Sequence, residues 1–183
     1  SVFAGVPVLP SGWGRVRVCL RVCLCVCLCL CRPCVCVCVC VCVCVVNTLF
    51  VYNIKAGNTF KTSLLDEIKT HLPSKFQSDF IEIQKFDSFD TDNYECLVAI
   101  GGDGTVNTVA KRAFNEKKIL AIIPRGSGDG LARFLGHTKQ IPIDVNTILN
   151  GQKIQIDTAD ISGHFFINLA GAGFEAEVAH AFD

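Results

Sequence analysis

The chain has 183 residues, enough for one domain or one and a half. Its 17 basic and 17 acidic residues cancel, but residues 47–183 hold all 17 acidic residues and only 13 of the basic ones, which leaves this part at −4. Binding to a nucleic-acid backbone needs clustered Lys and Arg, so we expect no nucleic-acid partner.

The first 46 residues differ in composition from the rest. Twelve of the 13 cysteines lie between Cys19 and Cys44, mostly alternating with Val or Leu, and this period of two is by itself typical of a strand. A disulfide framework would need turn residues between the cysteines, and a metal cluster would need spacings such as C-x-x-C, whereas C-x-C alternation is at best similar to that of metallothionein. A membrane span is the stronger alternative, but Arg21, Arg32 and Pro33 divide the apolar run into pieces shorter than about 20 residues.

A repeated TG dinucleotide explains this tract more fully, because its triplets encode Cys and Val in alternation. Single base changes in such a repeat give the Leu and Arg that interrupt it, and the chain contains no Met. We therefore expect residues 1–46 to be a translated repeat, with a hydrophobic anchor as the alternative. The fold is expected to begin near Asn47.

The remainder alternates strand and helix patterns. Short apolar runs predict strands at 47–54, 79–86, 95–100 and 118–124, and apolar residues at helical spacing predict helices at 59–73, 105–115 and 129–136. Such alternation indicates an α/β fold with a parallel sheet and right-handed crossovers, which we place at residues 47–151. Two strands at 153–161 and 164–170, joined by Ser-Gly, predict a hairpin that opens a second, antiparallel unit at residues 152–183.

Two glycine-rich stretches follow two of the predicted strands. GGDGT, at residues 101–105, ends a strand and precedes a helix whose free N–H groups attract phosphate. Glycines there permit a positive φ and close approach of a ligand. Asp103 would repel phosphate unless Mg²⁺ lies between them, and the alternative is a tight turn with Asp103 as helix N-cap. Because a second stretch, PRGSGDG at residues 124–130, follows the next strand, we predict a nucleotide site formed by both loops.

GGDGTVN, PRGSGDGLAR and the later FINLAGAGFEAEVA together resemble the diacylglycerol kinase catalytic domain, a family that includes bacterial lipid kinases, sphingosine kinases and ceramide kinases. The resemblance implies a phosphofructokinase-like nucleotide-binding domain followed by a β-sandwich domain that is truncated in this chain. It also implies transfer of the γ-phosphate of ATP to a lipid hydroxyl at a membrane surface, in a cytoplasmic protein with no membrane span.

The same resemblance assigns site residues. It implies that Asp103 and Asp157 hold Mg²⁺ and that ATP is contacted by Asn53, Gly101, Gly102, Asp103, Gly104, Thr105, Val106, Asn107, Gly126, Ser127 and Gly128. Departures from the family pattern include Ile54 in place of a proline, Asp129 in place of an asparagine beside the phosphate loop, and Glu175 in place of an aspartate.

The family's general base would lie beyond Asp183, so we assign no catalytic residue and expect the chain as given to be inactive as a kinase. An NAD kinase, which shares the GGDGT loop, and a non-catalytic nucleotide- or lipid-binding relic are the alternatives. The scattered histidines are expected to have surface or capping roles, and Cys96 to lie in the core.

Overall fold

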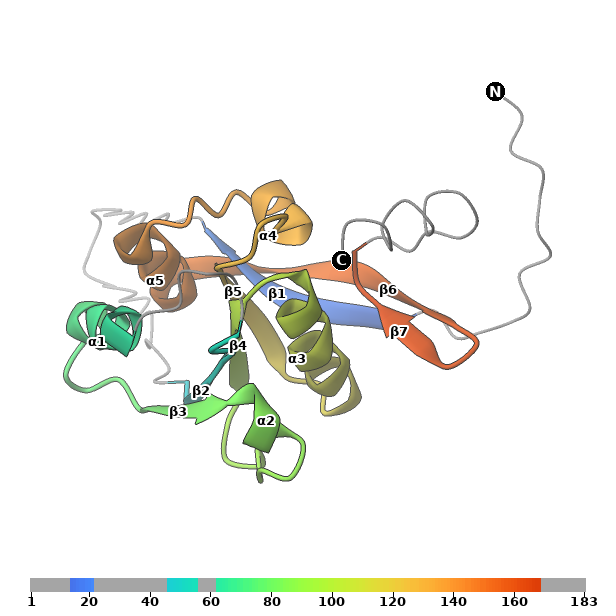
Figure 1. Ribbon diagram of the computed structural model, residues 1–183, viewed down its shortest axis with the longest axis horizontal. Helices are drawn as coiled ribbons and strands as arrows, with labels where there is room; N and C mark the ends of the chain where they lie inside the picture. Colours follow the sequence, from blue (N-terminus) through green and yellow to red (C-terminus); the bar gives the residue numbers. More distant parts are fainter. Residues whose placement is uncertain (1–13, 22–45, 56–61, 169–183) are drawn as a thin grey trace, which may run out of the picture.

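The computed structural model describes residues 14–21, 46–55 and 62–168 (Figure 1). Predictions for the rest of the Cys/Val tract and for the stretch that contains Glu175 lie outside these residues. Within the described part of the chain, no helix is long and apolar enough to cross a membrane.

Four parallel strands form the centre of the fold and confirm the predicted α/β class. They are β2 (Thr48–Tyr52), β3 (Ser78–Glu82), β4 (Cys96–Gly101) and β5 (Ile119–Pro124), in the order β3-β2-β4-β5. All six residues of β4 are buried, as expected for a continuous apolar run in a sheet covered on both faces. Cys96 begins this strand and belongs to the core, as predicted.

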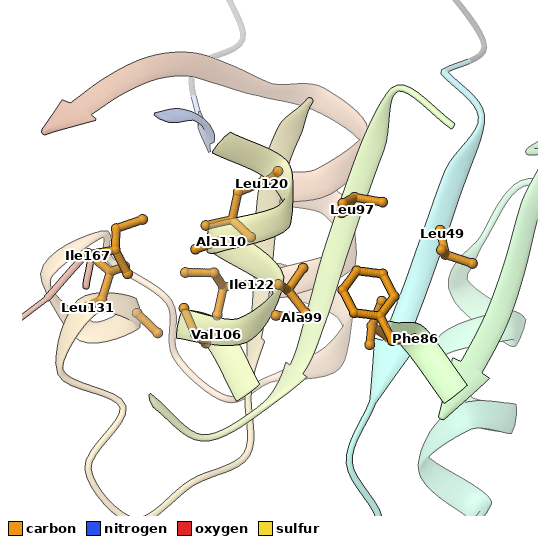
Figure 2. Packing of buried hydrophobic residues seen from close by; sticks show 14 of the residues in the cluster. Leu49, Phe86, Leu97, Ala99, Val106, Ala110, Leu120, Ile122, Leu131 and Ile167 are labelled. Carbon is orange, nitrogen blue, oxygen red and sulfur yellow. The ribbon is translucent and has the colours of Figure 1, made fainter. Parts of the chain in front are cut away.

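Helices cover both faces of the sheet. On one face α1 (Thr62–His71) and α5 (Ile141–Asn150) pack against alternate strand residues such as Phe50 and Val98. On the other face α3 (Asp103–Asn115) and α4 (Gly130–Phe134) cover the intervening residues, among them Leu97 and Ile122 (Figure 2). This alternation is the period of two expected for strands buried on both sides. The short helix α4 is followed, as predicted, by Gly136, which has a φ of 82°.

The strand predicted at 79–86 is shorter than expected. It ends at Glu82, and residues Ile83–Phe86 form the short helix α2. The helical turn carries Phe86 into the core, where its ring is fully buried and lies 4.8 Å from the guanidinium carbon of Arg112. Four residues are too few for a helical repeat to be visible in the sequence, and the alternation of apolar residues continued through them.

The sheet extends beyond β5 through three more strands. Strand β1 (Gly14–Arg21) is parallel to β5 and antiparallel to β6 (Gly151–Ile161), which in turn pairs with β7 (His164–Phe166). The β6–β7 hairpin was predicted. The expectation that the fold begins near Asn47 omits β1, whose eight residues cover the open edge of β5 and pair with β6 from Gly14↔Thr158 to Arg21↔Gly151.

Candidate nucleotide-binding site

Several of the predicted site residues lie where the chain reverses its direction of winding. From β2 the chain passes through α1 to β3 on one side, and from β4 it passes through α3 to β5 on the other. At such a point the loops after β2 and β4 diverge and leave a crevice at the carboxyl ends of the strands. A hydrogen bond from Asn53 Nδ2 to Thr105 Oγ1, 3.3 Å long, joins the loop after β2 to the first turn of α3.

The first glycine loop presents the free N-terminus of α3. Gly102 is the N-cap and has no side chain to cap the helix, and the first helical bond runs from Val106 N to Gly102 O at 3.0 Å. The N–H groups of Asp103, Gly104 and Thr105 therefore take no part in the helix ladder. A Cβ on Gly104 would meet no atom within 4 Å, and Asp103 and Gly104 are exposed, so the first turn of α3 is open at these two residues. The helix end is suited to an anion such as phosphate.

The glycines of the two loops pack against each other. A Cβ on Gly126 would lie 2.5 Å from the Cα of Gly102, and Arg125 N donates to Gly101 O at 2.8 Å. The expectation that these glycines supply a positive φ is wrong: in the described part of the chain only Gly136 and Gly163 do so among glycines. The absence of a Cβ serves instead to bring the two backbones together.

Asp103 links the two loops. Its Oδ1 accepts a hydrogen bond from Gly130 N at 3.0 Å, and its Oδ2 faces Gly128, where a Cβ would lie 2.8 Å away. Asp103 is therefore not the N-cap of its own helix, because its carboxylate contacts the first residue of α4. Asp103 remains exposed, and both of its carboxylate oxygens face the second loop.

The second loop is held by a buried carboxylate. Asp129 is only 2% exposed, has a left-handed φ of 50°, and accepts a hydrogen bond from Gly126 N at Oδ1. Its Oδ2 lies 2.7 Å from Lys139 Nζ. The negative charge that the sequence placed beside the loop is thus paired with a cation, and the N–H of Gly126 is engaged within the protein. Ser127 and Gly128 are exposed at the tip of the loop.

The other predicted site residues occupy different surroundings. Val106 is buried in the core, so only its backbone faces the loop region. Asn107 Nδ2 donates to Phe165 O in β7 at 3.0 Å, on the side of the hairpin. Asp157 is exposed on β6, where the neighbouring Ile156 packs toward the core. Its role as a metal ligand stays a prediction.

The carboxylate of Asp103 is the feature of the site that is compatible with Mg²⁺. Within the described residues no three His, Cys, Asp or Glu side chains form a metal cluster. However, Mg²⁺ is commonly held by one or two carboxylates together with phosphate oxygens and water. A single exposed carboxylate, Asp103, beside an open helix N-terminus is compatible with that arrangement.

The prediction for His137 is partly wrong. The backbone N–H of His137 caps α4 by donating to Ala132 O. The ring of His137 is buried, however, and its Nδ1 lies 3.2 Å from Oδ1 of the buried Asp144 in α5. Burial lowers the pKa of the nearby Arg125, although the charge of Asp144 acts to raise it. Sequence reasoning missed Asp144 and Lys139, because no motif marks residues that support a loop from a distance along the chain. It also assigned no role to Arg125, although this residue lies in the PRGSGDG stretch.

Comparison with known proteins identifies the family of this chain. The profile of the diacylglycerol kinase catalytic domain matches residues 47–161, well over half of the chain. The chain belongs to the diacylglycerol kinase catalytic domain family.

Relatives of this family member are 28–33% identical to it over the aligned segments. An uncharacterized protein of Synechocystis is 33% identical over 73% of the chain and 35% of its own length. The diacylglycerol kinase of Bacillus subtilis is 33% identical over 48% of this chain and 30% of its own length. The diacylglycerol kinase of Staphylococcus saprophyticus is 28% identical over 71% of this chain and 46% of its own length. A crystal structure from Bacillus anthracis, assigned to a diacylglycerol kinase, gives a TM-score of 0.45 at 25% identity and covers 56% of this chain and 39% of its own. The chain spans less than half the length of these curated relatives.

Proposed function

We propose that this chain is the nucleotide-binding part of an ATP- and Mg²⁺-dependent lipid kinase. The observation that carries the proposal is the meeting of two glycine loops at the point where the sheet reverses its winding, with the open N-terminus of α3 between them. Membership of the diacylglycerol kinase family and the names of its relatives support a lipid hydroxyl as acceptor.

The residues of the chain would act by positioning and by charge. The free N–H groups of Asp103, Gly104 and Thr105 would receive phosphate oxygens, and Ser127 would donate from the opposite loop. Asp103 would hold Mg²⁺, which when bound neutralises charge on the transferred phosphoryl group. Catalysis of phosphoryl transfer depends mainly on such positioning, which suits a site composed largely of backbone donors.

Calorimetric titration of the chain with ATP in the presence and absence of Mg²⁺ tests the proposal. We expect Mg²⁺-dependent binding that Asp103→Asn weakens, because the asparagine oxygen can still accept from Gly130 N but carries no charge. Asp92→Asn is the matched control, since Asp92 is an exposed carboxylate in the connector before β4. A folded chain that binds no nucleotide, or an Asp103→Asn variant that binds as the wild type does, would contradict the proposal.

The acceptor is tested separately. Transfer of radiolabelled phosphate from ATP to diacylglycerol or a sphingoid base in mixed vesicles, by a protein that contains this chain, is the expected result. Transfer to NAD with none to lipid would show that the alternative of an NAD kinase is correct.

A further inference from the structure

The second glycine loop depends on a residue outside both glycine motifs. Lys139 follows α4 by five residues, and its Nζ lies 2.7 Å from Asp129 Oδ2 and 2.6 Å from Gly126 O. Asp129 in turn accepts the hydrogen bond from Gly126 N. The carboxylate and the ammonium group together hold both the N–H and the C=O of Gly126.

The burial of the two partners differs, and this determines what each does. The side chain of Asp129 is 1% exposed, whereas that of Lys139 is 41% exposed. A buried carboxylate that loses its cation is strongly destabilised, while an exposed lysine that loses its partner is simply hydrated. Loss of Lys139 should therefore cost more free energy than loss of Asp129, because it leaves a buried charge without a partner.

The backbone of Lys139 is fixed as well as its side chain. Lys139 has a φ of 62°, which is uncommon for a residue with a Cβ, and its carbonyl oxygen accepts from Arg125 Nη1 at 3.1 Å. Arg125 is the first residue of the loop after β5, so the backbone and the side chain of Lys139 both contact this loop. The segment that carries Lys139 is thus tied to the loop that it supports.

We propose that Lys139 is a positioning residue for the second glycine loop. It neutralises Asp129 and holds Gly126 against Gly102, so that the exposed Ser127 and Gly128 keep the orientation in which they can meet phosphate. This inference rests on the proposed nucleotide binding. The pairing with Lys139 also explains how this chain accommodates the negative charge of Asp129 beside the loop.

The test is a double-mutant cycle on the whole chain, with Mg²⁺-ATP affinity measured by calorimetry and stability by thermal unfolding. Lys139→Met keeps the length of the side chain but leaves Asp129 buried without a cation. We expect it to weaken binding about tenfold, equivalent to about 1.4 kcal/mol, and to lower the unfolding temperature. Lys139→Arg should retain most of the affinity.

Removing the charge of Asp129 as well should restore the affinity that Lys139→Met loses. Asn at position 129 can still accept from Gly126 N and needs no cation, so we expect Asp129→Asn combined with Lys139→Met to bind within about threefold of the wild type. Lys111→Met is the control for overall charge, because Lys111 is an exposed lysine on α3. If the double variant binds as weakly as Lys139→Met, Lys139 acts by touching phosphate itself and the positioning role is wrong; wild-type behaviour of Lys139→Met also overturns it.

The two proposals fail in different ways. If the wild-type chain binds no nucleotide, the proposed function fails, and the thermal cycle still tests the Asp129–Lys139 coupling through rescue of stability. If the wild type binds but the cycle shows no coupling in affinity or stability, only the inference about Lys139 fails.

Discussion

Gly102 and Gly126 lie in backbone contact at the base of the candidate site, although 24 positions separate them in the sequence. A Cβ on Gly102 would lie 3.1 Å from the Cα of Gly126, and a Cβ on Gly126 would lie 2.5 Å from that of Gly102. Both distances are shorter than ordinary carbon–carbon contacts. The two loops therefore pack directly against each other, and this packing depends on both residues being glycine.

Gly126→Ala should disturb this contact. The added methyl group would also lie 2.8 Å from Asp129 Oδ1, and backbone atoms on the other side cannot rotate away. We expect a loss of about 1–3 kcal/mol in the free energy of unfolding, as for other overpacked positions. The measurement is urea denaturation, with Gly104→Ala as control because its Cβ would meet no atom within 4 Å. Equal stability of the two variants would refute the close packing of the loops.

Asn53→Ala should loosen the connection between β2 and α3. The substitution removes the hydrogen bond to Thr105 Oγ1, whose residue is buried, and the acceptor for Lys55 N. A buried hydroxyl left without its partner costs about 1–3 kcal/mol, and we expect that loss together with weaker ATP binding. Asn150→Ala, which breaks an exposed bond to Asn146 at the end of α5, should change neither quantity.

Asp144→Ala tests the buried pair beneath the second loop. The side chains of Asp144 and His137 are 1% and 2% exposed, and the charge of Asp144 also acts on Arg125. Without Asp144 the buried Nδ1 of His137 loses its partner, which typically costs about 1–3 kcal/mol, and we expect a loss of that size in chemical denaturation. His71→Ala, at an exposed position on α1, serves as the reference; a loss for Asp144→Ala no larger than for this variant would show that the pair is not structural.

The stability of the protein should fall in acid partly through Glu116. Burial alone would raise the pKa of this carboxylate, but hydrogen bonds from Arg112, Thr91 and Lys118 outweigh burial and lower it below its usual 4.5. The contribution is therefore complete above 4.5 and is lost as the pH falls through the lower value of the folded state. Glu116→Gln should be less stable at neutral pH and show a shallower decline between neutral pH and acid.

Unfolding free energies measured at several pH values check this prediction. Glu82→Gln is the control, because it removes a carboxylate at the end of β3 without removing an ion pair within the described part of the chain. If the acid decline of Glu116→Gln is as steep as that of the wild type and of Glu82→Gln, Glu116 does not carry the effect.

The sequence predicted those features that depend on local patterns. Continuous apolar runs identified β4 and β5, and glycine clusters after them identified the two loops, because strand ends in parallel sheets need such turns. It did not predict α2, which is shorter than two helical turns, or the pairing of β1 with β6, which joins residues more than 100 positions apart. Lys139 and Asp144 were missed for the same reason: their importance comes from partners that only folding brings near.

The hydrogen bond from Asn107 to Phe165 O has a consequence for motion. The ring centroid of Phe165 also lies 5.7 Å from that of Phe114, near the end of the same helix α3. Ile167, just after β7, is buried in the core that α3 covers. The hairpin that begins the antiparallel part of the chain is thus fastened along the helix that presents the first glycine loop. Closure of domains needs a hinge where few contacts cross, and the junction near Gly151 is not such a place. In a kinase that closes over its substrates, α3 and the β6–β7 hairpin would move together, and the hinge would lie outside the junction near Gly151.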